Sequence, residues 1–458
     1  MIHTFSMNHL NFVVDGNSGS IHVVDDVGFD IIRDKQELPC VDEVVKSLCN
    51  QYKKADILDA FTEIELLIKE GSLFTPESKL KAAAALKPEH SGIKALCLHV
   101  SHDCNLRCEY CFASKGDYQT GRKLMPEDVA LKATDYLVEQ SGHRHTIEID
   151  FFGGEPLLNF ETVKAVVAYG RELEHHTGKR FYFTITTNAT LLNDERIDFI
   201  NEHMDNVVIS IDGRKEIHDA VRHDAHGRGS YDDIIPLAQK LVAGRNGKSY
   251  FVRGTFTTKN KDFSHDVFHL ADLGFKEISV EPVVGSGDAM FIKESDIPEI
   301  FSEYERLALQ YLERIRNGKP FRFYHFNLDL YNGPCLFKRI TSCGAGFEYL
   351  AVSPDGIIYP CHQFVGQDEF VLGNVFNGIE NTELAGKFKN NTILAKKACS
   401  KCWAKLFCSG GCHANAWFTN GDLTMPNEMS CVLQKKRIEC AIMIQYLLKA
   451  ECNVTNAI

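Results

Sequence analysis

The feature that most constrains this chain is the spacing of its cysteines. Of the 16 cysteines, three lie in the short run Cys104-Asn-Leu-Arg-Cys108-Glu-Tyr-Cys111, and most of the others lie in the last third of the chain. The first residues, MIHTFSMNHL, lack the basic and apolar regions of a signal peptide, so we expect a cytoplasmic protein. In that compartment, closely spaced thiols are typical of metal or cluster ligands rather than of disulfides.

The first cysteine group provides three thiols from one loop. Structural zinc sites and [4Fe–4S] clusters both use four ligands, so three thiolates on such a cluster leave one iron open. An open iron can chelate a small molecule, such as the amino and carboxylate groups of a methionine derivative. The alternative is a zinc site completed by His99 or His102.

From Leu96 the pattern alternates between strands and helices. The predicted strands are 96–100, 146–151, 181–187, 206–211, 250–257 and 277–282, and the predicted helices are 125–140, 160–175, 193–203, 231–243, 264–273 and 295–316. Six such units predict an α/β fold with a parallel sheet or a partial barrel. In these folds the chemistry lies at the carboxyl ends of the strands, which is where the motifs described below fall.

The N-terminal stretch has a different pattern. Residues 2–6, 11–14 and 20–25 are predicted strands, and residues 41–51 and 55–70 are predicted helices, which suits a winged-helix-like module. We predict four segments: the N-terminal module 1–78, a linker 79–94, an α/β core 95–330 and a Cys-rich domain 331–458.

Composition excludes two classes of partner. The net charge of −12 opposes nonspecific binding to nucleic acid. No stretch approaches the run of about 20 apolar residues that a membrane helix needs. We therefore expect neither a nucleic acid nor a membrane as a partner.

The C-terminal segment contains enough thiols for two four-ligand centres. Eight of its ten cysteines are candidate ligands, namely Cys335, Cys343, Cys361, Cys399, Cys402, Cys408, Cys412 and Cys431. The turn signal Pro354-Asp355-Gly356 could fold a hairpin that brings Cys361 near Cys343. Short CxxC pairs also occur in zinc knuckles, so a pair of zinc sites is the alternative.

The first cysteine group and the strand-end motifs together resemble the radical S-adenosylmethionine (SAM) superfamily. The motifs are CxxxCxxC, Gly153-Gly154-Glu155-Pro156, Thr186-Thr187-Asn188 and Ser210-Ile-Asp-Gly213 with Arg222. The resemblance implies a partial (β/α)6 barrel in which the first three cysteines bind a [4Fe–4S] cluster. It also implies that SAM contacts Tyr110, Gly153, Gly154, Glu155, Thr187, Asn188, Ser210, Asp212 and Arg222.

The C-terminal pattern resembles the SPASM extension of peptide-modifying radical enzymes. The resemblance implies one auxiliary cluster on Cys343, Cys361 and Cys412, with Cys335 as a fourth ligand or an open iron in its place. It implies a second auxiliary cluster on Cys399, Cys402, Cys408 and Cys431, which makes three [4Fe–4S] clusters in all.

Finer matches resemble the maturases that form thioether cross-links in SCIFF peptides, which are sactipeptide or ranthipeptide precursors. These matches include IHVVDD, HDCNLRCEYCFASKGDY and YPCHQF. They imply a ribosomal precursor peptide whose leader binds the N-terminal module, and a low-potential electron donor such as flavodoxin or ferredoxin. His362 stands where sulfatase-maturing relatives have an Asp, and it is either a base or a packing residue. The alternatives are another SPASM enzyme, such as a sulfatase maturase, and a zinc-stapled winged-helix regulator without catalysis.

Overall fold

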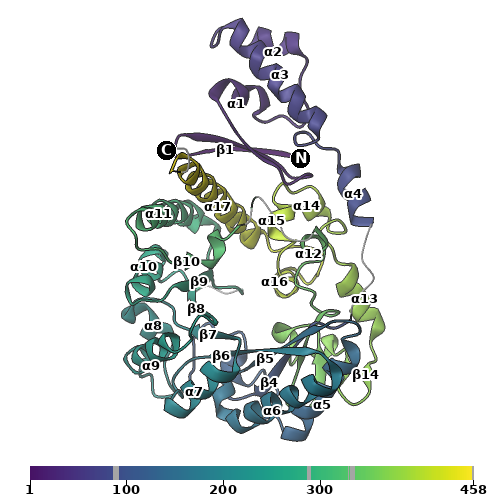
Figure 1. Ribbon diagram of the computed structural model, residues 1–458, viewed down its shortest axis with the longest axis vertical. Coiled ribbons are helices and arrows are strands. Elements are labelled where there is room, and N and C mark those ends of the chain that lie inside the picture. Colours follow the sequence, from purple (N-terminus) through teal and green to yellow (C-terminus); the bar gives the residue numbers. More distant parts are fainter. Residues whose placement is uncertain (86–91, 286–289, 329, 331–335, 456–458) are drawn as a thin grey trace. The chain divides into compact units, whose positions relative to one another are not determined.

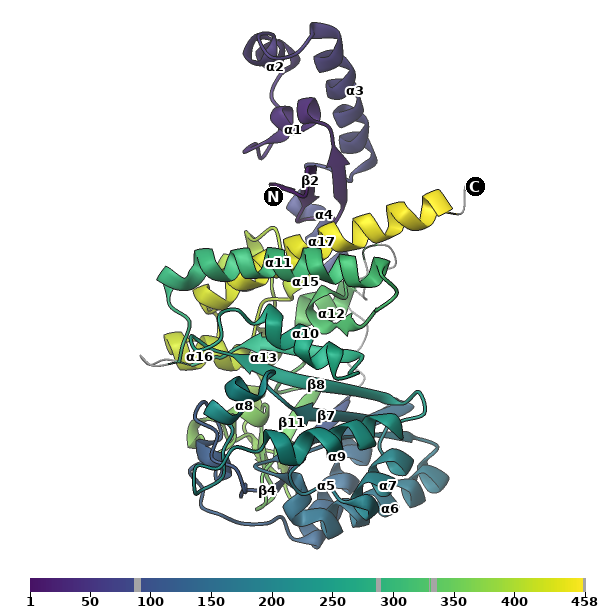
Figure 2. The same cartoon turned by 90° about the vertical axis from the view of Figure 1, so that its left-hand side faces the viewer.

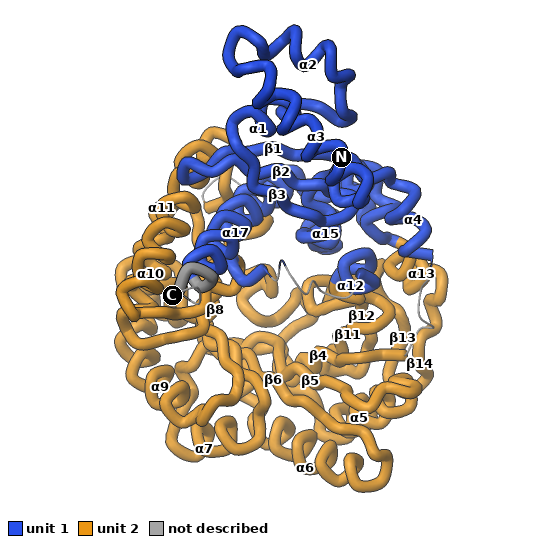
Figure 3. Tube along the Cα trace, turned by 45° about the horizontal axis from the view of Figure 1, so that its top comes forward, with its two compact units in different colours: residues 1–88, 326–342, 391–458 blue, residues 89–325, 343–390 orange. Residues whose placement is uncertain are grey.

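The chain divides into two compact units, shown in Figure 3. The computed structural model describes residues 1–85, 92–285, 290–328, 330 and 336–455, so Cys335 lies outside the described residues. Unit 1 joins residues 1–88, 326–342 and 391–458, and unit 2 joins residues 89–325 and 343–390. The chain therefore passes between the units four times.

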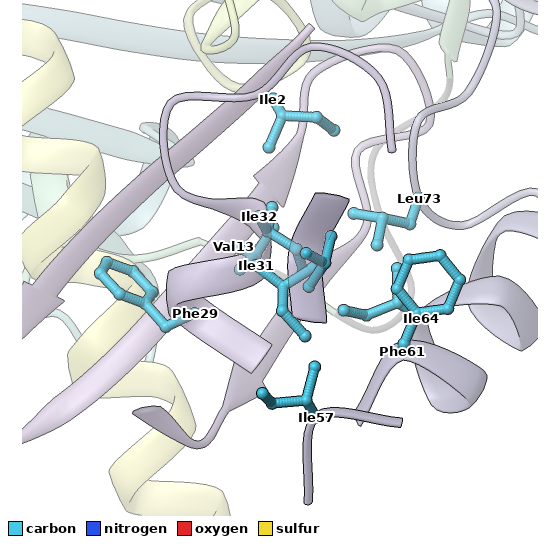
Figure 4. Close-up of a cluster of buried hydrophobic side chains, with 10 residues drawn as sticks. Ile2, Val13, Phe29, Ile31, Ile32, Ile57, Phe61, Ile64 and Leu73 are labelled. Atoms are coloured by element: carbon cyan, nitrogen blue, oxygen red, sulfur yellow. The ribbon is translucent and has the colours of Figure 1, made fainter. Parts of the chain in front are cut away.

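Unit 1 begins with an antiparallel sheet in the order β1-β2-β3, followed by helices. The elements are β1 (Ile2–Met7), β2 (Leu10–Asp15), β3 (Ile21–Val24), α1 (Asp26–Ile32), α2 (Val41–Leu48), α3 (Lys54–Glu70) and α4 (Glu77–Ala85). Apolar side chains such as Val13, Ile31 and Phe61 form a buried core between the sheet and the helices (Figure 4). The three predicted strands and both predicted helices are confirmed. The sequence prediction missed α1, and α4 lies partly in the predicted linker.

The rest of unit 1 consists of helices. They are α12 (Leu336–Thr341), α14 (Lys397–Ser400), α15 (Lys405–Cys408), α16 (His413–Asn420) and α17 (Glu428–Thr455). Figures 1 and 2 both show α17 running beside the N-terminal sheet. Among the described helices, none is long and apolar enough to cross a membrane.

Side chains far apart in the sequence join the N-terminal sheet to the C-terminal helices within unit 1. The His3 ring stacks on Trp403 with centroids 4.0 Å apart, and the ammonium of Lys405 donates a hydrogen bond to Asn17 at 2.6 Å. A Cβ atom at Gly16 would lie 2.6 Å from the Cα of Trp403, so only glycine fits there. The N-terminal sheet thus packs directly on Trp403 and Lys405, which follow Cys399 and Cys402 closely in the chain.

Unit 2 contains an 11-stranded sheet with helices along its outer side (Figure 1). Its parallel strands are β4 (Ala95–Ser101), β5 (Thr146–Gly153), β6 (Arg180–Thr187), β7 (Asn206–Ser210), β8 (Ser249–Phe256), β9 (Glu277–Pro282) and β10 (Arg322–Phe323). Its helices are α5 (Glu127–Gln140), α6 (Phe160–Thr177), α7 (Asp194–His203), α8 (Lys215–Val221), α9 (Tyr231–Ala243), α10 (Ser264–Asp272), α11 (Ile297–Arg316) and α13 (Thr382–Asn390). Six of the strands and six of these helices match predicted segments, which confirms the α/β fold.

The other strands of this sheet come from the Cys-rich segment. They are β11 (Tyr349–Val352), β12 (Ile357–Tyr359), β13 (Gly373–Asn374) and β14 (Gly378–Ile379). β11 pairs parallel with β4, and β12 pairs antiparallel with β11 through the predicted turn. Gly356 has φ +80° in this turn, a conformation that favours glycine. The compact units therefore do not follow the predicted segment boundary at residue 331.

Candidate cofactor and cluster sites

A cavity of about 150 Å³ lies at the carboxyl ends of β4, β5, β6 and β7. Its lining residues are Cys104, Leu106, Cys108, Tyr110, Cys111, Phe112, Ala113, Lys115, Gly116, Phe152, Gly153, Gly154, Glu155, Thr186, Thr187, Asn188, Ser210 and Arg222. The structure thus brings together the three thiols of the first group and the residues predicted to contact SAM, except Asp212. Sequence reasoning missed Phe152, which belongs to none of the motifs, and gave no role to Lys115 and Gly116, which lie within HDCNLRCEYCFASKGDY.

Two glycines let the end of β5 approach the cysteine loop closely. Gly153 has φ +127°, and a Cβ atom there would lie 2.1 Å from the carbonyl oxygen of Ser101. A Cβ atom at Gly154 would lie 2.2 Å from the carbonyl oxygen of Asp103. Because no side chain covers these backbones, their polar groups can face a bound ligand.

Glu155 is buried behind this segment and holds the end of β6. Its carboxylate accepts hydrogen bonds from the Thr187 hydroxyl at 2.8 Å, the Asn188 backbone N–H at 2.8 Å and the Leu157 backbone N–H at 3.1 Å. Burial raises the pKa of Glu155 to about 7, although these hydrogen bonds oppose the shift. In this arrangement Glu155 fixes Thr187 and Asn188 at the cavity wall.

Asp212 lies behind the cavity and orients Arg222. The Arg222 guanidinium donates to the Asp212 carboxylate at 2.9 Å, and the Tyr110 hydroxyl donates to the same carboxylate at 2.7 Å. The guanidinium carbon of Arg222 also lies 5.4 Å from the centre of the Tyr110 ring. The buried Asp212 therefore forms an ion pair with Arg222. Of these two residues, Arg222 lines the cavity.

Hydrogen-bond donors face two of the three sulfurs in this cavity. The Cys104 sulfur accepts from the Leu106 N–H at 3.4 Å and from the Asn188 amide at 3.6 Å, and Arg222 lies 3.9 Å from the Cys108 sulfur. Burial raises the pKa of Cys104 to about 12 and that of Cys108 to about 11. Such donors stabilise the thiolate form, and hydrogen bonds to sulfur change the reduction potential of iron–sulfur clusters. These residues fit a three-thiolate cluster with SAM beside it.

His362 packs behind the aromatic wall of the cavity and does not line it. Its ring lies 5.1 Å from the Phe152 ring and 5.7 Å from the Phe112 ring. Its Nδ1 atom lies 3.3 Å from the hydroxyl of the half-buried Tyr349. Burial lowers the pKa of His362 to about 4. The contacts describe a neutral, packed imidazole.

A second cavity, of about 850 Å³, lies within unit 1 between α14, α15 and the start of α17. The four cysteines that the SPASM resemblance assigns to the second auxiliary cluster, Cys399, Cys402, Cys408 and Cys431, all line it. Burial raises the pKa of Cys399 to about 11 and that of Cys431 to about 12. In the part of the chain that the structure describes, no group of His, Cys, Asp and Glu side chains is gathered to hold a single metal ion. The four thiols share the wall of one cavity, and their number fits the four ligands of a [4Fe–4S] cluster.

The residues predicted to bind the other auxiliary cluster are divided between the two units. Cys361 is buried and Cys343 is exposed, and both belong to unit 2. Cys412 is exposed and belongs to unit 1. Cys335, predicted as the fourth ligand, lies outside the described residues.

Comparison with known families defines the class of protein. Residues 98–287 match the radical SAM superfamily, and residues 343–403 match SPASM, an iron–sulfur cluster-binding domain. The chain therefore contains a radical SAM domain and a SPASM domain. These two domains imply SAM and [4Fe–4S] clusters as cofactors.

Several curated proteins are similar in sequence. An uncharacterised protein of Methanocaldococcus jannaschii is 35% identical over 195 residues, 42% of this chain, and the chain spans 63% of that relative's length. The radical SAM cyclopropyl synthase TigE of Paramaledivibacter caminithermalis is 23% identical, over 79% of this chain and 75% of its own. A cysteine-type anaerobic sulfatase-maturating enzyme of Clostridium novyi is 25% identical, over 69% of this chain and 86% of its own.

Solved structures show the same fold. The enzyme anSMEcpe with bound AdoMet and the Cp18Cys peptide has a TM-score of 0.65 at 21% identity, and the match covers 79% of this chain and 99% of that one. Streptococcus suis SuiB bound to its precursor peptide SuiA has a TM-score of 0.51 at 16% identity, and the match covers 91% of this chain and 95% of that one.

Proposed function

We propose that this chain is a maturase that forms thioether cross-links in a ribosomally made, Cys-rich precursor peptide. Each cross-link joins a cysteine sulfur to a carbon of another residue, so the peptide loses two hydrogen atoms. When bound, SAM on a reduced [4Fe–4S] cluster supplies a 5′-deoxyadenosyl radical, which removes a hydrogen atom from a C–H bond. We propose three clusters, one on the first thiol group and two in the SPASM domain.

The chain's own residues would bind SAM and keep water away. Arg222, held by Asp212, would bind the carboxylate of SAM, and Thr187 and Asn188, held by Glu155, would bind its ribose. The backbone at Gly153 would contact its amino group. The wall formed by Phe112 and Phe152 would exclude water from the reacting atoms.

The N-terminal sheet is the observation that carries the assignment of a peptide substrate. β3 lies at one edge of the three-stranded sheet and is available to pair with an extended segment. At the other edge, the backbone of Ile2 is already hydrogen-bonded to the Gln36 side chain. Gln36 accepts from the Ile2 N–H at 3.0 Å and donates to the Ile2 carbonyl at 3.1 Å. Addition of a strand to an exposed edge is a common way to bind a peptide. We therefore propose that the leader pairs with β3.

A sulfatase maturase is the second candidate, favoured by the similarity to the enzyme of Clostridium novyi. The residue after Cys361 separates the two. Sulfatase-maturing relatives resemble this chain there but have an Asp, whereas this chain has His362, which packs on Phe152 and does not line the first cavity. This difference supports thioether formation over oxidation of a sulfatase residue.

Mass spectrometry under anaerobic conditions tests the proposal. The enzyme, reconstituted with iron and sulfide, is incubated with SAM, a reductant and a panel of Cys-rich precursor peptides that carry their leaders. We expect the loss of two hydrogen atoms for each cross-link, with fragment ions missing between the joined residues. A Cys→Ser version of the same peptide is the matched control and should stay unmodified.

Two further arms decide between the candidates. A peptide without its leader should be modified far more slowly if β3 binds the leader. A Cys-containing peptide from a sulfatase should remain unchanged. Conversion of that peptide to its aldehyde, with no cross-link in any precursor, would contradict the proposed function.

A further inference from the structure

The segment around the second cavity has a charge opposite to that of the whole chain. Residues 391–437 contain seven Lys or Arg and only two Asp or Glu, while the chain as a whole has a net charge of −12. A concentration of positive charge at one place on an acidic protein produces a local field that attracts anionic partners.

Some of these lysines are used inside the protein. The Lys396 ammonium is buried and donates to the Gly410 carbonyl at 2.9 Å. Lys405 is buried against Asn17, and Lys436 pairs with Glu439 at 3.5 Å. These side chains have structural partners.

Three lysines at the cavity have no such partner. Lys397 and Lys401 are exposed, Lys435 is half-buried, and all three line the cavity that contains the four thiols. Within the described part of the chain, none of the three forms an ion pair. We call these three residues the lysine face. Glu428 is the one acidic residue that lines the same cavity among the described residues.

The lysine face lies close to sulfurs that are near the surface. Cys402, Cys408 and Cys431 are each only partly buried. The adjacent Met425 is 55% exposed and gives this face an apolar contact area. Lysines and an exposed apolar side chain beside four candidate cluster ligands have the features of a transient electron-transfer interface, which is typically small and steered by charge.

We propose that the lysine face is the docking surface for a small acidic one-electron carrier protein. This inference rests on the proposed function, which requires an external electron. The reduced carrier loses one electron and the enzyme gains that electron at the site of the four thiols. No bond forms or breaks, and no atom is transferred between the two proteins. The lysines attract the carrier and orient it, and Met425 contacts its apolar surface.

Binding of flavodoxin to the reconstituted enzyme tests this proposal without any peptide substrate. The test variant is Lys397→Glu/Lys401→Glu/Lys435→Glu. The matched control is Lys46→Glu/Lys276→Glu/Lys319→Glu, which changes the net charge equally at three exposed lysines elsewhere. A milder variant with Gln at the three positions of the lysine face guards against misfolding, and iron content is measured for every preparation.

We expect the Glu variant of the lysine face to raise the Kd for flavodoxin at least tenfold at low salt and the Gln variant to have an intermediate effect. The control should change the Kd less than twofold, and wild-type affinity should fall as ionic strength rises to about 0.15 M, where the Debye length is about 8 Å. Oxidation of photoreduced flavodoxin, followed by flavin absorbance, should slow in parallel.

Three results would overturn the proposal: equal effects of the test and control variants, flavodoxin binding that does not depend on salt, or a lysine face that binds an acidic leader peptide but not flavodoxin. These results differ from failure of the proposed function. If the enzyme forms thioethers but binds flavodoxin elsewhere, only the proposed docking surface is wrong. If the enzyme binds flavodoxin at the lysine face but forms no cross-link, only the proposed thioether activity is wrong.

Discussion

At the end of β5, one buried carboxylate satisfies three donors that would otherwise face the protein interior. Glu155 accepts from Leu157, Thr187 and Asn188, and it has no cation within hydrogen-bond distance among its described partners. The same residue therefore supports both the fold and the SAM site, because Thr187 and Asn188 line the cavity.

We predict that Glu155→Ala destabilises the protein by about 2–3 kcal/mol, since it leaves buried donors without acceptors. It should also weaken SAM binding. Thermal unfolding and equilibrium binding of SAM measure the two effects. Glu172→Ala, at an exposed glutamate of α6, is the control and should change stability by less than about 0.5 kcal/mol. Equal stability of the two variants would contradict the role given to Glu155.

Asp150, on β5, gives a prediction about pH. Burial raises its pKa to about 7, with the nearby Glu148 acting in the same direction and Thr184 opposing. The folded state thus binds the proton more tightly than the unfolded state, so stability falls as pH rises from about 4 to about 7. Asp150→Asn removes this contribution. The melting temperature of Asp150→Asn should therefore drop less between pH 5 and pH 8 than that of the wild type. An unchanged pH profile would show that Asp150 ionises normally.

At the residue scale, the motifs include most of the residues that line the first cavity. The thiols and strand-end residues follow buried strands directly, so their meeting at one edge of the sheet follows from the parallel fold. The hydrogen bond from Arg222 to Asp212 could not be predicted, because it depends on where the end of α8 lies relative to β7. The contacts of His362 with Phe112 and Phe152 likewise depend on the placement of distant segments.

At the element scale, the parallel strands and their helices were predicted because each has a clear period of apolar residues. α1 and α8 each have only seven residues, too few for a periodic signal. The addition of β11 to the edge of the sheet next to β4 was not predicted either. Pairing between strands that lie more than 200 residues apart cannot be recognised from the local sequence.

Gly16 provides a prediction about contact between elements. A Cβ atom there would meet the backbone of Trp403 at 2.6 Å, and neither backbone can move freely. We expect Gly16→Ala to destabilise unit 1 by about 1–3 kcal/mol, as overpacking does. Thermal unfolding measures the loss, and limited proteolysis should show earlier cleavage near the N-terminus. Gly386→Ala in α13 has no neighbour within 4 Å, so it should be neutral or slightly stabilising.

At the scale of the whole molecule, the number of clusters can be counted. We expect about twelve irons per chain in protein reconstituted under nitrogen, as three four-iron clusters require. The Cys104→Ala/Cys108→Ala/Cys111→Ala variant should retain about eight irons. Iron and sulfide analysis provides the measurement. Zinc in place of iron in the C-terminal sites would contradict the auxiliary clusters.

Loss of one auxiliary ligand should separate two activities. Cys402→Ala removes a thiol of the second cavity but leaves the first cavity intact. We predict that this variant still forms 5′-deoxyadenosine from SAM but no longer forms the thioether. Chromatography of the nucleoside and mass spectrometry of the peptide follow the two products. A variant with full cross-linking activity would show that the second auxiliary site is not needed for cross-linking.

The pairing of the N-terminal sheet with α17 has a consequence for biosynthesis. β1 contacts α17, the last helix of the chain, and the Trp403 beneath His3 is also made late. Because β1 precedes α17 in the chain, this surface of the sheet stays uncovered until α17 has been synthesised. The thiols of Cys399 and Cys402 gain their covering at the same late moment. Cluster insertion at this site is therefore expected to follow synthesis of α17, which also provides Cys431, and a nascent chain stalled before α17 should lack this cluster.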